Sequence, residues 1–485
     1  MTHLDTTAPT GTSPAGTAPT GTDPARTRLP GGSSLLSGLP GRQGFGDASL
    51  IRVGTGSIDL GGGNPDRSLL PVDLYREAVH ELMDSPGYGA RLGYVPAAGT
   101  PSFRALLAER EGVSPERIIV TSGGINGLAL AVLGTLDPGD TIVVDDPIFP
   151  LFLRVLDLVP GVRVVPVGVQ ADGLDVDALE AHLAAGVRPQ AVFTVPTFHN
   201  PGGAVLSAQK AQRITELAER WGFTVFADDP YRELAFPGAE VPAAAWVRDS
   251  EHVIGVNTFS KTLGPALRLG YNVVPSALAE QYVKLRNRLD GQASGVLQDI
   301  VERIVGRPEY AQANAAAGAV YAQKARALLD ALHRELPGEL DIIEPQGGFF
   351  LWARFRDQHA DFAALFDAAQ DEGLVYQRGE WFGVTPTGGA GGASGAASAA
   401  GAASAAGAAG DAVGAANAAG PAGGAAVAAN VAGAAGGAAG ATGQGLGGDP
   451  SRTRGAVRLT FAELDVPTLE EGAARLGRAW RRIHG

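Results

Sequence analysis

Lysine is rare in this chain, and one lysine stands among residues that could assist its chemistry. Only four lysines occur among 485 residues, and Lys261 lies in the stretch NTFSKTLGPALRLGYNVV. A lysine amine becomes a useful nucleophile where it can form a Schiff base with a carbonyl compound. Thr258 and Ser260 precede Lys261 and Arg268 follows it, so hydroxyl and guanidinium groups could hold a phosphate on that compound. The segment therefore favours a reactive lysine beside a phosphate site.

Three other segments place small or polar residues where an apolar run ends. One begins a predicted helix, whose free N–H groups can bind an anion. Another ends in two carboxylates, and a carboxylate could pair with a protonated ring nitrogen. Together with the lysine and the phosphate cradle, this is the arrangement that pyridoxal 5'-phosphate requires. The residues are Gly123, Gly124 and Ile125 in TSGGING, Asn200 in FHNPGG, and Asp228, Asp229 and Tyr231 in ADDPY.

Each segment taken alone has a simpler interpretation. The glycines could serve only a turn, Asn200 could be chosen for the Pro-Gly turn that follows it, and adjacent acids often cap, solvate or hold a metal. TFSK also resembles the S-x-x-K pattern of a hydrolase with Thr258 as nucleophile, but the S-D-N and K-T-G partner motifs are absent. No histidine cluster suggests a metal, and His199 is expected to line the mouth of the site rather than act as a base.

The segments that carry these residues alternate with helical patterns. RIIVTSGG precedes INGLALAVLGTL, and AVFTVPTFHNPGG precedes SAQKAQRITELAERWG. Ser207 can cap that last helix and Gly222 can end it. Ile214, Leu217 and Trp221 share one of its faces. The alternation predicts an α/β fold with a mostly parallel sheet flanked by helices, in which ligands bind beyond the carboxyl ends of the strands.

Two stretches of the chain have a composition that cannot build a core. Residues 1–41 are rich in Thr, Pro and Gly, and residues 384–454 are dominated by Ala and Gly. Each glycine would cost about 1 kcal/mol inside a helix, so we expect a disordered leader and a flexible insertion. The net charge of -13 argues against nucleic acid or an anionic membrane as a partner, and the absence of cysteine excludes disulfides and thiolate chemistry. No apolar run suggests a signal peptide or a membrane span, which predicts a cytoplasmic protein.

The order of the motifs resembles that of the class I/II aminotransferases, which are pyridoxal phosphate enzymes of fold type I. The similarity is greatest to the branch with 2-aminoadipate and kynurenine aminotransferases and to the aminotransferase-like domain of GntR-type regulators. It covers Ile58–Gly383 and Gly455–Gly485. The motifs are GGGNPD, LGYVPAAGTPSFR, TSGGINGL, DDPIF, FHNPGG, ADDPY, NTFSKTLGPALRLGY, GGFFLW and VRLTF.

The resemblance implies a role for each matching residue of this sequence. Lys261 resembles the lysine that forms the Schiff base, Asp228 the partner of the ring nitrogen, and Arg458 the arginine that grips the substrate carboxylate. Tyr94 resembles a tyrosine that reaches the phosphate of the neighbouring subunit, which implies a homodimer. The other implied contacts are Asn200 and Tyr231 at the phenolic oxygen of the cofactor, Phe149 on its ring face, Gly123, Gly124, Ile125, Thr258, Ser260 and Arg268 at its phosphate, and Gly63 and Asn200 near the substrate.

The activity that the resemblance implies is amino transfer from an α-amino acid to a 2-oxo acid, with Lys261, Asp228 and Tyr231 as catalytic residues. The same lysine and aspartate also serve lyases, decarboxylases, oxidases and cyclising synthases, so these stay alternatives. A regulator that binds the cofactor without turnover is a further alternative, although the residues before the resemblance show no helical pattern. The implied domains are a leader at 1–41, a large cofactor domain at 71–318, a smaller α+β domain made of 42–70, 319–383 and 455–485, and an insertion at 384–454.

Overall fold

The computed structural model describes residues 32–40, 56–242, 244–384 and 449–484. Most of the predicted leader and residues 385–448 of the predicted insertion lie outside the described residues. Within the leader, the described part contains the short helix α1 (Ser34–Gly38), which begins where the Ser33 side chain accepts a hydrogen bond from the N–H of Leu36. The prediction of a leader without regular structure missed this helix.

Eight strands form the large sheet, in the order β2-β9-β8-β7-β6-β3-β4-β5. Neighbours from β8 through β7, β6 and β3 to β4 are parallel, whereas β9 is antiparallel to both β2 and β8. The predicted mostly parallel sheet is confirmed, and the carboxyl ends of β2, β3, β6, β7 and β8 meet at one edge. The strands are β2 (Ile118–Thr121), β3 (Thr141–Asp146), β4 (Arg163–Gln170), β5 (Gly173–Leu174), β6 (Ala191–Thr194), β7 (Thr224–Asp228), β8 (Val253–Thr258) and β9 (Gly270–Val273).

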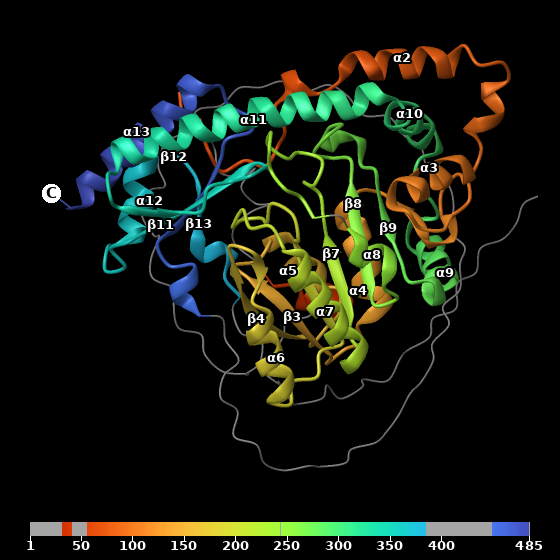
Figure 1. Ribbon diagram of the computed structural model, residues 1–485, viewed down its shortest axis with the longest axis horizontal. Coiled ribbons are helices and arrows are strands. Elements are labelled where there is room, and N and C mark those ends of the chain that lie inside the picture. Colours follow the sequence, from red (N-terminus) through yellow and green to blue (C-terminus); the bar gives the residue numbers. More distant parts are fainter. Residues whose placement is uncertain (1–31, 41–55, 243, 385–448, 485) are drawn as a thin grey trace, which may run out of the picture.

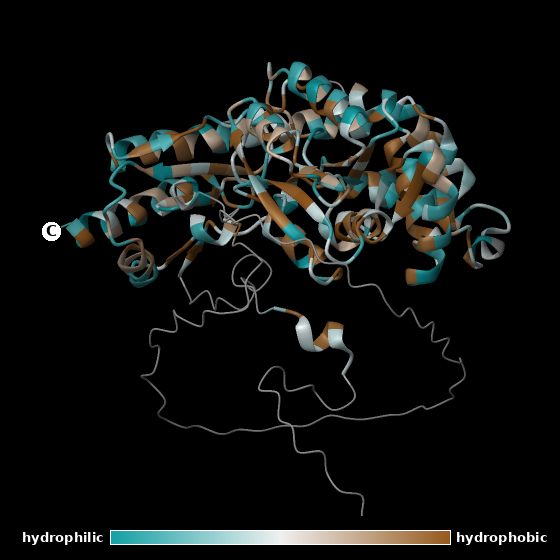
Figure 2. Ribbon diagram, turned by 90° about the horizontal axis from the view of Figure 1, so that it is seen from below, coloured by the Kyte–Doolittle hydropathy of each residue, from teal (hydrophilic) through white to brown (hydrophobic). Residues whose placement is uncertain are grey.

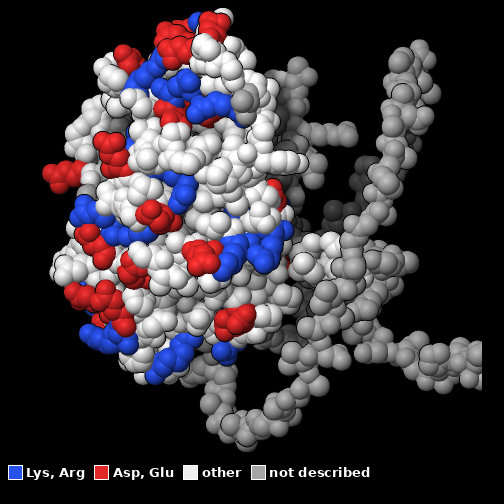
Figure 3. Space-filling view, turned by 90° about the vertical axis from the view of Figure 1, so that its right-hand side faces the viewer, with Lys and Arg blue, Asp and Glu red and all other residues white. Residues whose placement is uncertain are grey.

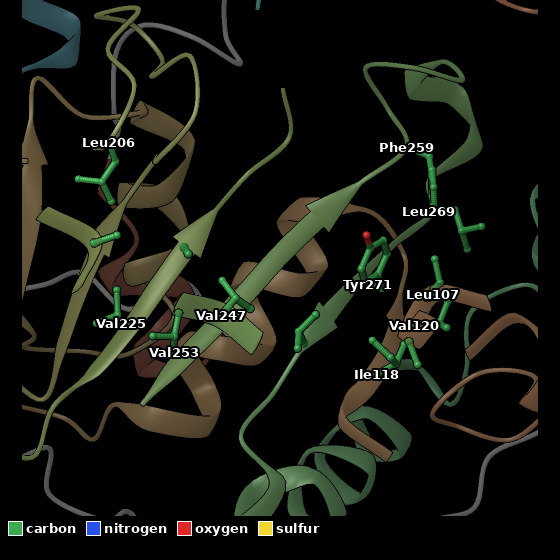
Figure 4. Close-up of a cluster of buried hydrophobic side chains, with 14 of the residues drawn as sticks. Leu107, Ile118, Val120, Leu206, Val225, Val247, Val253, Phe259, Leu269 and Tyr271 are labelled. Atoms are coloured by element: carbon green, nitrogen blue, oxygen red, sulfur yellow. The ribbon is translucent and has the colours of Figure 1, made fainter. Parts of the chain in front are cut away.

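Helices cover both faces of this sheet (Figure 1), and strand β3 shows why. Successive strand residues point to opposite faces, so a strand covered on both sides must be apolar throughout. Ile142 and Val144 belong to the hydrophobic cluster under α4, α5 and α9, whereas Val143 belongs to the cluster under α3, α6, α7, α8 and α10. Part of the second cluster, including Leu107 and Val225, is drawn in Figure 4. These helices are α3 (Pro101–Glu111), α4 (Gly124–Thr135), α5 (Pro150–Leu156), α6 (Val176–Ala184), α7 (Ala208–Trp221), α8 (Ala245–Asp249), α9 (Ala279–Asp290) and α10 (Gly295–Val305).

Helix α7 follows the pattern that its sequence predicts. The Ser207 hydroxyl accepts a hydrogen bond from the N–H of Lys210 at 3.3 Å, and Gly222 ends the helix at a φ of 75°. Ile214 and Leu217 are buried against the sheet. Figure 2 shows the same division across the molecule, with hydrophobic strands inside and hydrophilic residues on the outer faces of the helices.

A smaller α+β part lies beside the large sheet (Figure 1). Its sheet is antiparallel in the order β10-β11-β14-β13, and its own hydrophobic cluster includes Leu351, Leu459 and Leu476. Helix α11 runs without a break through residues 318–319, where the sequence predicts a domain boundary. The elements of this part are α11 (Pro308–Glu335), α12 (Phe362–Asp371), α13 (Val466–His484), β10 (Leu340–Ile342), β11 (Phe350–Phe355), β13 (Gln377–Arg378), β14 (Ala456–Thr460) and the parallel pair β1 (Ile58–Asp59) and β12 (Leu374–Val375). Helix α2 (Val72–Met83) belongs to the larger part, because its buried Ala78 and Leu82 lie in the same hydrophobic cluster as Val143.

The surface carries charges of both signs. On the face in Figure 3, lysine and arginine side chains lie among aspartate and glutamate side chains. Arg307, for example, reaches both Glu77 and Glu81, at 2.6 and 2.5 Å. Within the described ranges, no helix is both long and apolar enough to cross a membrane.

Candidate active site

The strand ends that carry the predicted cofactor residues surround one cavity at the edge of the large sheet. Its volume is about 170 Å³. The structure therefore brings together residues that the sequence separates by more than a hundred positions. From the predicted set, the lining includes Gly124, Ile125, Phe149, Asn200, Asp228, Tyr231, Thr258, Ser260, Lys261 and Arg268.

One end of the cavity is built to hold an anion. Helix α4 starts there, after Gly123 has turned the chain at a φ of 90°. The hydroxyls of Thr258 and Ser260 lie 2.9 Å apart at the end of β8. The Arg268 guanidinium packs against Gly123 so closely that a Cβ on this glycine would lie 2.9 Å from Nη2. A helix N-terminus, two hydroxyls and a guanidinium fit the phosphate of pyridoxal 5'-phosphate.

Asp228 lines the same cavity, at the end of β7. Its carboxyl group is buried, and burial together with the neighbouring Asp229 raises its pKa to about 7, against the opposing effect of Lys261. A positive charge nearby would favour the ionised form of such a buried carboxyl group. The protonated ring nitrogen of the cofactor would supply that charge, so the residues present fit the ring as well as the phosphate.

The amine of Lys261 is held between the two parts of the protein. Its Nζ donates a hydrogen bond to the carbonyl of Gly63 at 2.8 Å and lies 5.6 Å from the ring centroids of Tyr231 and Phe349. Burial and the cation of Arg458 lower the pKa of Lys261 to about 8. A desolvated lysine of this kind has more neutral amine near neutral pH and is therefore a better nucleophile.

The lowered pKa of Lys261 has a measurable consequence for cofactor capture. In the cofactor-free protein, the rate of pyridoxal phosphate capture is expected to rise with pH and to level off above about 8, because only the neutral amine attacks. A lysine in water would continue to gain neutral amine up to about 10.4. Stopped-flow absorbance between pH 6 and 10 measures the profile, and a rate that keeps rising through pH 9 to 10 would contradict the burial argument.

Arg458 reaches the site from β14 of the smaller part. Its side chain is fully buried, its guanidinium stacks 4.0 Å from the ring centroid of Phe350, and burial lowers its pKa to about 9. Nη1 donates to Oδ1 of Asn200 at 3.0 Å, and Nη2 donates to the carbonyl of Gly61 at 2.7 Å. Arg458 and Asn200, which are predicted substrate contacts, therefore touch each other, and Gly63 touches Lys261.

Tyr94 and His199 are two residues singled out in the sequence that do not line the cavity of this chain. Tyr94 is fully exposed and does not line the cavity of its own chain. His199 is buried instead of lying at the mouth of the site, so that expectation is wrong. The N–H of Gly202 donates to Nδ1 of His199 at 3.0 Å, which places the ring proton on Nε2, 3.2 Å from the carboxylate of Asp145. His199 thus braces the turn that carries Asn200.

Sequence reasoning missed two features of the site. Phe349 lies near Nζ of Lys261, and Phe350 lies against the guanidinium of Arg458. Their only sequence signal was the GGFFLW motif, to which no role was given. Arg452, which the sequence places in the insertion, lies 3.5 Å from the buried carboxylate of Asp146, just before the segment that carries Phe149. No local signal links Arg452 to Asp146, because they are 306 positions apart.

Comparisons with known proteins show which family the chain resembles. The family model for aminotransferase class I and II matches residues 55–391. A 2-aminoadipate transaminase from Thermus thermophilus is 30% identical over 327 residues, which are 67% of this chain and 81% of the relative. The vitamin B6 salvage pathway transcriptional repressor PtsJ from Salmonella typhimurium is 32% identical over 339 residues, which are 67% of this chain and 72% of the relative.

Solved structures show the same fold. The crystal structure of an α-aminoadipate aminotransferase from Thermus thermophilus has a TM-score of 0.71 at 24% identity, and the match covers 94% of this chain and 98% of that chain. The resemblance in the motifs, with an aminotransferase branch and a regulator branch, is confirmed by the relatives. The chain belongs to the class I and II aminotransferase family, and its cofactor is pyridoxal 5'-phosphate.

Proposed function

We propose that the protein is an aminotransferase that moves an amino group from an α-amino acid to a 2-oxo acid. The observation that carries the proposal is the meeting of Lys261, Asp228 and Arg458 around Asn200, with a nucleophile, an acid and a carboxylate-binding cation in one site. When bound, pyridoxal phosphate supplies an electron sink for the charge left on the substrate Cα.

Residues of the chain bind the substrate, move its proton and exclude water. Arg458 and Asn200 bind the substrate carboxylate and so fix the direction of the Cα–H bond. Lys261 would hold the cofactor and, once released from it, would move the proton of the substrate Cα on its Nζ. Asp228 would keep a proton on the ring nitrogen of the cofactor, and Tyr231 would donate a hydrogen bond to its phenolic oxygen. The buried rings of Phe349 and Phe350 exclude water around the two cations.

A half-reaction tests this function directly. The purified protein, loaded with pyridoxal phosphate, is mixed with single amino acids in the absence of any 2-oxo acid, and its visible absorbance is followed. A transaminase converts the yellow lysine-bound form to the pyridoxamine form with its true donor, and a 2-oxo acid restores the yellow form. A yellow protein that no amino acid converts would contradict amino transfer and favour a lyase, an oxidase or a regulator.

We also infer that the protein acts as a homodimer in which Tyr94 completes the partner's phosphate site. Tyr94 is 100% exposed and Leu92 is 63% exposed in the single chain. Large exposed side chains grouped in one loop are typical of a surface that a partner covers. The exposed phenol supports the role that the resemblance implies for this residue.

Hybrid dimers distinguish a shared site from a self-contained one. Lys261→Ala and Tyr94→Ala proteins, each weakened alone, are unfolded, mixed and refolded together. If Tyr94 serves the partner, each hybrid dimer has one site with both native residues and one site with neither. Half of the dimers formed are hybrids. The mixture is therefore expected to recover about a quarter of the native capacity for tight cofactor binding. If no capacity beyond that of the separate variants returns, Tyr94 does not act across the interface.

A further inference from the structure

Gln377 on β13 is a buried polar side chain that the mechanism above does not use. The residue is fully buried, and neither its carbonyl nor its amide group meets a hydrogen-bond partner among the residues that the structure describes. Buried carboxamides normally have partners, because burying one without a partner is costly. An unsatisfied carboxamide at this depth therefore indicates a group that awaits a ligand.

Gln298 on α10 shows what a structural glutamine looks like in the same protein. It is equally buried, yet its Oε1 accepts from the N–H of Thr100 at 2.8 Å and its Nε2 donates to the carbonyl of Ala293 at 3.1 Å. Gln298 thus ties two chain segments together. Gln377 has the same chemistry and burial without those bonds, so the two glutamines form a matched pair.

Gln377 lies beside the cation that binds the substrate carboxylate. It pairs directly with Arg458 across β13 and β14, and residues paired in this way point to the same face of the sheet. Both side chains reach Gly61. Arg458 donates to its carbonyl at 2.7 Å, and a Cβ on Gly61 would lie 3.0 Å from Nε2 of Gln377. The absence of a side chain on Gly61 allows this close approach.

Three consecutive backbone carbonyls accept hydrogen bonds from Arg458 and Lys261, the two cations of the site. Those of Gly61 and Gly62 accept from Arg458 at 2.7 and 3.3 Å, and that of Gly63 accepts from Lys261 at 2.8 Å. A carboxylate accepts charge-assisted hydrogen bonds more strongly than a neutral carbonyl does. A substrate carboxylate can therefore displace the turn from Arg458, and this movement would open the space beside Gln377.

We propose that Gln377 is a further substrate-binding residue, which donates its amide N–H to the substrate carboxylate next to Arg458 once the Gly61–Gly63 turn has moved. The carboxamide can rotate to present either edge, so it can offer the donor that a carboxylate requires. Asp59 also lies against Gly61, where its Oδ1 accepts from the Gly61 N–H at 2.7 Å. The negative charge of Asp59 repels the substrate carboxylate. The substrate carboxylate therefore binds on the side of Gln377 that faces Arg458. The inference deepens the proposed function and rests on it.

Thermal unfolding separates a ligand-binding glutamine from a structural one. Gln377→Leu is expected to keep or raise the Tm of the ligand-free protein, because it removes a buried group that has no partner. Gln298→Leu, the matched control, is expected to lower the Tm, because it leaves the groups on Thr100 and Ala293 unpaired. If Gln377→Leu lowers the Tm as much as Gln298→Leu does, Gln377 has a structural role and the inference is overturned.

Carboxylate binding tests the role itself. Isocaproate and glutarate carry carboxylates but neither an amino nor an oxo group, so they bind without reacting, and the rise in Tm of the cofactor-loaded protein with their concentration gives Kd. Gln377→Leu is expected to weaken binding about tenfold, Gln377→Glu further, and Gln298→Leu not at all. Equal Kd values for wild type and Gln377→Leu, or no binding of either acid to wild type, would overturn the inference.

The two proposals fail in different ways. A wild-type protein that binds the acids through Gln377 but converts no amino acid would contradict amino transfer and leave the carboxylate contact standing. If the wild-type protein transaminates and Gln377→Leu leaves the Kd of the acids unchanged, the role of Gln377 is overturned and amino transfer stands.

Discussion

Lys261→Ala is expected to lower the turnover of amino acids by at least about 10⁴-fold. The variant loses both the nucleophile that holds the cofactor and the group that moves the proton from Cα. No other lysine can take over, because Lys210, Lys284 and Lys324 do not line the cavity. Single-turnover absorbance with the donor found in the half-reaction measures the loss.

Lys284→Ala is the matched control for this variant. Lys284 is half-exposed on α9, where it pairs with Glu280 at 2.6 Å, so its removal costs only a surface ion pair. The control is expected to keep the wild-type rate and the yellow colour. A Lys261→Ala protein that still transaminates at the wild-type rate would refute the mechanism, whereas loss of both activities would indicate a general effect on the fold.

Asp228→Asn is expected to lower turnover by about 10³-fold with little change in the amount of cofactor bound. The substitution keeps the shape of the side chain and removes the negative charge that holds the proton on the ring nitrogen. The phosphate cradle of Thr258, Ser260 and Arg268 is untouched, so the cofactor should remain bound. Turnover and bound cofactor, measured on the same sample, separate the two effects.

Asp229→Asn is the control that shows whether the loss depends on the place of Asp228 in the cavity. Asp229 is the next residue along the chain, and its pKa is also raised, to about 6, by burial, with Arg232 opposing the shift. It does not line the cavity that holds Lys261. Asp229→Asn is therefore expected to turn over within a few-fold of wild type. If the two asparagine variants lose the same activity, the loss reflects local charge at the end of β7 and not a contact with the cofactor.

The sequence by itself determined the sheet and the chemistry at its edge. Apolar runs such as Thr141–Asp146 are local signals, because a strand buried on both faces must be apolar at every position. The cap at Ser207 and the end at Gly222 are local as well. Residues that follow parallel strands must converge, so the cavity with Asp228 and Lys261 could be predicted before its geometry was known.

The tertiary structure alone decided how the smaller part completes the site. The approach of Arg458 to Asn200 joins residues 258 positions apart, and the pairing of Gln377 with Arg458 depends on the register of two strands. His199 shows the same limit, since its burial against Asp145 could not be read from its place beside Asn200. Spacing along the chain predicts contacts within one element or at one sheet edge. Contacts between separately built parts depend on how their surfaces pack, and that packing is set by many side chains at once.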